Sequence, residues 1–118
     1  MGQPYDPLRF LTVADELAEG SSDEARLRTA VGRAYYALFL VALDKTGLSR
    51  KGNPRHKEVL RKVKDRDRGT GEKLATLLRV RASADYRVLP DPRYPNWTSN
   101  WSLAKILVED ILPKIQSW

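Results

Sequence analysis

Two arginines and a tyrosine in the second half of the chain are well suited to contact a phosphate group. They lie in the run RVRASADY, as Arg79, Arg81 and Tyr86. On a helix, Arg79 and Tyr86 would be about 20° apart, on a face without large apolar residues. Arg81 would fall among leucines, with Asp85 four residues later, so we expect an Arg81–Asp85 ion pair. The pattern favours Arg79 with Tyr86 as ligand-facing residues and Arg81 as a structural one.

The phenol of Tyr86 restricts the reactions that this group of residues can support. A tyrosine side chain has an ordinary pKa of about 10, so it is almost wholly protonated at pH 7 and is a poor general base. It can still donate a hydrogen bond to a phosphate or stack on a nucleobase. The residue types therefore favour phosphate binding over proton transfer.

The positive charge of the sequence is concentrated between Arg50 and Arg68. The chain has a net charge of +6, and nine basic residues against three acidic ones in this segment account for all of it. Such an excess suits a polyanionic partner such as RNA, DNA or a nucleotide, and Arg61 and Lys64 are the candidate RNA contacts here. The alternative is a solvated, charged helix face.

Cysteine and histidine usage excludes several classes of site. The sequence has no cysteine and a single histidine, His56. It therefore offers no disulfide, no cysteine nucleophile and no multi-histidine metal site within one chain. We expect neither a metal nor a cofactor. No apolar run approaches the roughly 20 residues of a membrane span, and the first residues include no apolar leader segment, so we expect a cytoplasmic protein with no membrane partner.

The element that must position these residues is a long central helix, predicted from Ser21 to Lys45. Ser21 followed by Glu24 fits a capping box, and Gly47 lies where a left-handed residue ends a helix. One broad face is apolar, comprising Leu27, Ala30, Val31, Ala34, Leu38, Val41 and Ala42. From residue 34 to 43 the other side is nearly apolar as well, so the helix should be buried on more than one face.

Four further helices complete the predicted fold. Asp6 can cap the first one, and Gly20 follows its end. The later helices are predicted at 54–67, 72–86 and 100–116. The Gly-Thr-Gly run at 69–71 should separate two of them. No segment alternates with period two, so we predict a single all-α domain over residues 1–118, an antiparallel up-and-down bundle of about five helices.

The second side of the central helix carries charge and aromatic rings. Arg33 shares a stripe there with Leu40, and it is either a surface arginine or one that binds an anion or lies at an interface. Tyr35 and Tyr36 point about 100° apart, so one should be in the core and the other at an interface. We expect a homodimer interface on this side. For His56, which opens the third helix, we favour a structural role over a catalytic one.

Three segments in order resemble the HEPN family. They are LRTAVGRAYYALFLVAL at 27–43, His56-Lys57, and RASADY at 81–86. The resemblance implies an antiparallel helical bundle, commonly a homodimer, with a role around RNA or nucleotides. Many HEPN proteins are metal-independent ribonucleases that act as toxins or defence effectors, often encoded with a nucleotidyltransferase antitoxin. Others are non-catalytic binding modules.

The catalytic HEPN signature is an arginine followed, after four to six residues, by a histidine. In this sequence Tyr86 stands at the histidine position, counted from either Arg79 or Arg81. A HEPN ribonuclease here would have to work with a phenol in place of an imidazole. Because a phenol is a poor base at neutral pH, the resemblance favours binding over cleavage.

Three hypotheses for the function follow. The leading one is a HEPN-like domain that binds RNA or a nucleotide in a toxin–antitoxin or defence system. The second is an active metal-independent ribonuclease toxin that uses Arg79 or Arg81 with Tyr86. The third is a non-catalytic interaction module whose basic helix docks a nucleotidyltransferase-type partner. The candidate RNA contacts of the leading hypothesis are Arg79, Tyr86, Arg33, Arg61 and Lys64.

Overall fold

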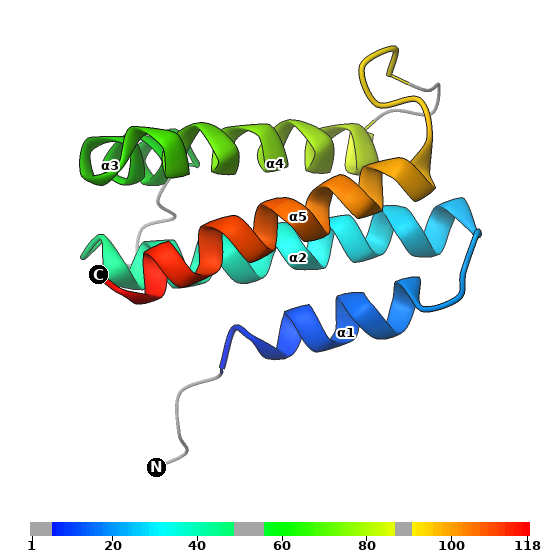
Figure 1. Cartoon of the computed structure of the whole chain (residues 1–118), viewed down its shortest axis with the longest axis horizontal. Helices are drawn as coiled ribbons and strands as arrows, with labels where there is room; N and C mark the ends of the chain where they lie inside the picture. The colour runs from blue at the N-terminus through cyan, green and yellow to red at the C-terminus, as the bar shows by residue number, and fades with distance from the viewer. Residues whose placement is uncertain (1–5, 49–55, 87–90) are drawn as a thin grey trace.

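The computed structural model describes residues 6–48, 56–86 and 91–118, and this part of the chain is an all-α bundle (Figure 1). Its only extended pairing is an isolated bridge between Asp91 and Tyr94. The predicted all-α class is therefore confirmed. The helices are α1 (Arg9–Ala18), α2 (Glu24–Lys45), α3 (His56–Arg66), α4 (Arg68–Tyr86) and α5 (Trp97–Gln116).

The long helices α2 and α5 lie side by side at the centre and run in the same direction (Figure 1). At one end, Lys45 Nζ donates hydrogen bonds to the carbonyls of Gln116 (3.3 Å) and Trp118 (3.0 Å). At the other end, the Arg28 guanidinium lies 4.8 Å from the centre of the Trp97 ring. Helices α1 and α4 run the opposite way and lie on opposite sides of this pair (Figure 1). The bundle is thus up-and-down, with α2 and α5 as its central pair.

The core is built mainly on α2, as its apolar pattern predicts. Every residue of the predicted apolar face is buried except Val41, which is half-buried. Leu27, Leu38 and Leu43 are at most 2% exposed, and burying each leucine contributes about 1.5–3 kcal/mol to folding. The alanines between them are small enough to let neighbouring helices approach closely. Burial on more than one side of the central helix is confirmed.

The start of the central helix differs from the predicted capping box. Helix α2 begins at Glu24, and its N-cap is Asp23, whose carboxylate accepts a hydrogen bond from the Ala25 amide at 2.9 Å. Ser21 Oγ accepts instead from the Asp23 amide at 3.1 Å. Asp23 is a better N-cap than Ser21 because its negative charge also complements the helix dipole. The predicted end is confirmed, since Gly47 follows α2 with a φ of 75°.

The predicted separation of the third and fourth helices is present, but it falls at Asp67, because the Gly-Thr-Gly run lies in the first turn of α4, which begins at Arg68. A Cβ atom on Gly71 would lie 2.8 Å from Lys64 Cα and 2.9 Å from Lys64 N. Glycine is needed there because the backbones of α3 and α4 meet at this point. The Asp67 carboxylate between the helices accepts a hydrogen bond from Thr70 Oγ1, which lowers the pKa of Asp67.

Two other helix starts are shifted from their predicted positions. Helix α5 begins at Trp97, three residues early, because the Asn96 side chain accepts from the Ser99 amide at 3.0 Å and caps the helix there. Helix α1 begins at Arg9, and Asp6 supports the preceding turn by accepting from the Leu8 amide at 3.0 Å. The predicted start of the third helix at residue 54 lies outside the described residues.

Candidate functional site

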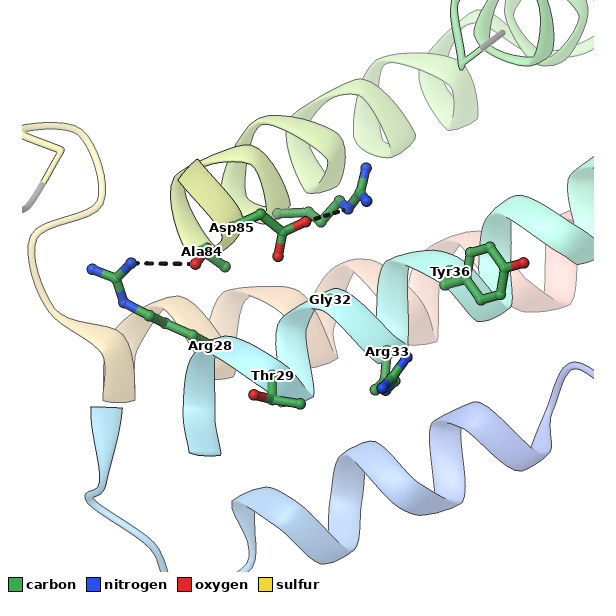
Figure 2. Close-up of a pocket in the computed structure, with 8 residues that line it drawn as sticks. Arg28, Thr29, Gly32, Arg33, Tyr36, Ala84 and Asp85 are labelled. Carbon is green, nitrogen blue, oxygen red and sulfur yellow. Dashed lines mark hydrogen bonds and ion pairs between the residues drawn. The ribbon is translucent and has the colours of Figure 1, made fainter. Parts of the chain in front are cut away.

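A cavity of about 390 Å³ opens between the N-terminal half of α2 and the C-terminal end of α4 (Figure 2). Five of its lining residues come from α2 and three from α4. It is rich in arginine and holds a single carboxylate. The lining residues are Arg28, Thr29, Gly32, Arg33, Tyr36, Arg81, Ala84 and Asp85.

Gly32 leaves the floor of this cavity open. Arg28, Gly32 and Tyr36 are spaced by four residues, so they lie on one face of α2. A Cβ atom added at Gly32 would meet only Asp85 Oδ1, at 3.7 Å, and Figure 2 shows Asp85 reaching from α4 toward Gly32. A glycine inside a helix costs about 0.5–1 kcal/mol relative to alanine. Glycine at position 32 therefore leaves the cavity open and lowers the stability of α2.

Arg28 forms the wall at one end of the cavity and ties α4 to α2. Its Nη1 atom donates to the carbonyls of Ser83 (3.4 Å) and Ala84 (3.2 Å), which belong to the last turn of α4. Its Nε lies 3.3 Å from the Glu24 carboxylate, and its guanidinium stacks on the Trp97 ring. A cation that satisfies the last carbonyls of a helix also interacts favourably with the helix dipole. Arg28 is therefore a structural part of the site.

Arg81 lines the cavity from α4 and makes the ion pair that its spacing predicts. Its Nε lies 2.9 Å from Asp85 Oδ2, with the arginine side chain 26% and the aspartate 35% exposed. The guanidinium carbon also lies 5.6 Å from the centre of the Tyr35 ring. The predicted Arg81–Asp85 pair is confirmed. Both partners nevertheless face a cavity that a ligand can enter, so the pair does not exclude a role in binding.

Arg79, which the helix pattern favours as ligand-facing, does not line this cavity. It is exposed on α4, where its Nη2 atom donates to Thr76 Oγ1 at 3.1 Å. The helical pattern favoured Arg79 because it lies on the side of α4 without large apolar residues. The cavity instead opens next to the side of α4 that packs on α2, where Arg81 lies. Tyr86 is the last residue of α4, and its side chain lies outside the described part of the structure. Phosphate contacts of Arg79 and Tyr86, and a ribonuclease role for them, stay predictions.

Arg33 is the exposed arginine of the cavity. Its guanidinium carbon lies 6.0 Å from the centre of the Phe10 ring on α1. Within the described residues it has no ion pair and no side-chain hydrogen bond. The donors of this guanidinium are therefore available to an incoming anion, in contrast to those of Arg28 and Arg81.

Behind Arg81, the only histidine packs against two aromatic rings of α2. His56 Nδ1 and the Tyr35 hydroxyl are 2.7 Å apart, and the His56 and Phe39 ring centres are 4.7 Å apart. Burial, and then the charge of Arg81, lowers the pKa of His56 below its ordinary value, which favours the neutral ring. Burial raises the pKa of Tyr35. His56 therefore supports the wall of the cavity rather than lining it.

Helix α3 begins beside the cavity wall at His56, but its basic candidates lie further along it, where it packs on the first turns of α4. Arg61 and Lys64 are both exposed, as a solvated or RNA-facing surface requires. The backbone of Lys64 contacts Gly71, which precedes Arg81 by ten residues, or about 15 Å along a helix. Of the candidate RNA contacts, Arg33 lines the cavity, Arg79 is exposed on α4 outside it, and Arg61 and Lys64 lie on α3.

Only Arg33 and Arg81 of the eight lining residues are among the sequence-based site candidates, and the other six are absent from them. Thr29, Gly32 and Tyr36 line it together with Arg33. A usable signal was present for Gly32, because a glycine in the middle of a strongly helical segment costs stability and suggests a close approach or a required space. Arg28 and Tyr36 lie four residues to either side of it, which indicates one shared helix face.

The described part of the chain contains neither a candidate metal-binding cluster nor a candidate membrane-spanning helix. No group of three or more histidine, aspartate or glutamate side chains is placed to hold a metal ion there. None of the helices from α1 to α5 is long and apolar enough to cross a membrane.

The fold and this site define a small all-α domain with an arginine-lined cavity, and comparison with known proteins adds one relative. The chain is 42% identical over 64 residues to uncharacterized protein MJ0628 of Methanocaldococcus jannaschii, a match that includes 51% of this chain and 39% of the relative. The chain thus spans well under half the length of that relative. No family model and no solved structure matches the chain.

Proposed function

We propose that this chain is a HEPN-like domain that binds RNA or a nucleotide, with the cavity between α2 and α4 as the site for a phosphate group. The observation that carries the proposal is the composition of the cavity wall, in which three arginines surround about 390 Å³ of open space with a single aspartate among them. Such a wall has an excess of positive charge, which attracts a polyanion and favours its entry.

The three arginines of the cavity have different roles in this proposal. Arg28 holds the end of α4 against α2 and shares its charge with Glu24. Arg33 offers guanidinium donors that have no polar partner among the described residues, and a planar guanidinium matches two oxygens of a phosphate at once. Arg81 shares its charge with Asp85, so its contact with a phosphate would be weakened by that carboxylate. Arg33 is therefore the residue on which affinity should depend most.

A fluorescence anisotropy titration with a short labelled single-stranded RNA tests the proposal. The variant Arg33→Gln should bind at least about 10-fold more weakly, because a charge-assisted hydrogen bond contributes about 1.5–3 kcal/mol. The slope of log affinity against log salt should also become less steep by about one.

The matched control is Arg68→Gln, which removes the same charge at the other end of α4. Arg68 is exposed and pairs with Glu72 at 3.1 Å, about 20 Å along the helix from Arg81. This variant should keep nearly wild-type affinity. Equal losses in both variants would mean that the RNA senses only net charge or also binds the basic segment that ends at Arg68, and unchanged affinity in Arg33→Gln would exclude the cavity as the site.

The same proposal includes the homodimer and the toxin–antitoxin or defence setting that the HEPN resemblance implies. On the second side of α2, Arg33 and Tyr36 are exposed while Phe39 is buried and Leu40 is half-buried within the chain. Because Arg33 and Tyr36 line the proposed binding cavity, a dimer interface on this side has to leave both side chains accessible to the ligand. Sedimentation equilibrium of the chain alone tests this, and a monomer at all concentrations would contradict it.

A further inference from the structure

One aromatic side chain at the rim of the cavity is unusually exposed. Tyr36 is 41% exposed, and only Ile106 on α5 is a more exposed large apolar or aromatic residue in the described chain. Tyr36 lines the arginine-rich cavity, whereas Ile106 does not. Its neighbour Tyr35 is 1% exposed, so the two tyrosines divide between the core and the cavity.

The ring of Tyr36 is held in place by two other rings. The Phe10 ring of α1 lies edge to face with it, at 5.1 Å between ring centres and 77° between planes. The Phe39 ring lies nearly parallel to it, 6.4 Å away and tilted by 14°. A side chain that is fixed before binding loses little conformational entropy when a ligand packs on it. The exposed part of this ring is therefore a preorganised contact surface.

Arg33 lies on the same side of α2 as this ring. The two residues are three positions apart, which places them side by side along one helix face. Phe10 contacts both, since the Arg33 guanidinium carbon lies 6.0 Å from the centre of its ring. A cation for a phosphate and a partly exposed aromatic ring are thus adjacent, and a cation beside an aromatic ring is the pair of contacts by which proteins hold single-stranded nucleic acid.

The size of the cavity agrees with a ligand larger than one phosphate group. Its volume of about 390 Å³ lies within the range of about 300–1,000 Å³ that is usual for sites of organic ligands. Gly32 keeps the space between the arginines and Tyr36 open. A phosphate alone would occupy only a part of it.

We propose that Tyr36 stacks on a nucleobase, and that the site takes unpaired, base-bearing RNA or nucleotide rather than a bare phosphate chain. This inference rests on the proposed function, since it assigns the second half of the same ligand. A base within a duplex is stacked on its neighbours and presents no face to a side chain, so the site discriminates against double-stranded RNA.

The experiment compares two single-stranded probes of equal length and charge, one of uridines and one with abasic ribose throughout. The wild-type chain should bind the uridine probe about 5- to 100-fold more tightly, which is the usual effect of one base–aromatic stack. Tyr36→Leu should remove most of that difference by weakening the binding of the uridine probe. Tyr36→Phe, which keeps the ring, should stay within about 2-fold of wild type for both probes.

The outcomes separate this inference from the function on which it rests. Equal affinity of the wild-type chain for the two probes, with both affinities lowered by Arg33→Gln, would overturn the role of Tyr36 and leave phosphate binding intact. A uridine preference that survives in Tyr36→Leu would overturn it as well. Failure of both probes to bind would overturn phosphate binding itself. Because Tyr36 is partly exposed, the leucine variant should fold, and its circular dichroism spectrum and melting curve check that.

Discussion

The glycine on the floor of the cavity allows stability and binding to be separated by substitution at one position. Gly32→Ala adds a methyl group whose only close neighbour is Asp85 Oδ1 at 3.7 Å, an ordinary van der Waals distance. Replacing a helical glycine by alanine stabilises the helix by about 0.5–1 kcal/mol. For a domain of this size, that corresponds to a rise of about 2–5 °C in melting temperature.

The longer variant Gly32→Met should uncouple the two properties. Methionine has nearly the helix propensity of alanine, so the melting temperature should stay at or above that of the wild type. Its side chain would extend into the space between Arg28, Asp85 and Tyr36, where we place the ligand. We therefore expect RNA affinity to fall at least about 10-fold in Gly32→Met and less than about 3-fold in Gly32→Ala.

Thermal unfolding and RNA anisotropy on the same three proteins provide the measurement. The expected pattern is a variant that is at least as stable as the wild type and yet binds poorly. Wild-type affinity in a folded Gly32→Met variant would refute the cavity as the binding site. A melting temperature lowered in Gly32→Ala would refute the open space that the structure shows above Gly32.

Two further predictions concern the helices that frame the site. Gly71→Ala should destabilise the fold by about 1–3 kcal/mol, because its Cβ would lie 2.8 Å from Lys64 Cα. Gly69→Ala should be neutral or stabilising, since the nearest neighbour of its Cβ, Asp67 Oδ1, is 3.9 Å away. Equal urea midpoints for the two variants would contradict this packing. The pKa of His56 is lower in the folded chain than its ordinary value of about 6.5 in the unfolded chain. Between these two pKa values the unfolded chain binds more protons than the folded one, so the free energy of unfolding should fall as the pH drops below about 6.5 and level off below the folded pKa. Urea unfolding from about pH 7.5 to pH 5 should show this loss in the wild type and a smaller one in His56→Gln, and parallel curves would contradict it.

The course of the central helix follows from the sequence because its apolar pattern and its ending are local. The burial of Leu27 and Leu38 and the turn at Gly47 need only helical periodicity and the conformational freedom of glycine. The separation of α3 and α4 was predicted too late, at the Gly-Thr-Gly run instead of Asp67. Low helix propensity favours a break at the glycines, but Gly71 lies within α4, where its missing side chain lets the backbone of Lys64 on α3 approach.

Only part of the candidate site could be predicted from the sequence. The rest depends on which sides of α2 and α4 face each other. The Arg81–Asp85 pair follows from a spacing of four residues along one helix, and it is present. The choice between Arg79 and Arg81 as the cavity-facing residue needs the position of α4 on α2. That position is set by core packing between helices far apart in the sequence, for which a helical wheel of α4 alone contains no information.

Three features that add little to stability, or reduce it, meet at this one place on α2. Gly32 weakens the helix, Arg33 is left without a polar partner among the described residues, and Tyr36 exposes an aromatic ring to solvent. Any one of these is unremarkable on a protein surface. Their coincidence within one helical turn and a half, around an open cavity, is hard to explain by folding, because other residues would satisfy the local requirements better. Local violations of this kind concentrate at functional sites, where ligand contacts replace the missing internal ones, and this is the physical reason to examine this surface before the basic face of α3.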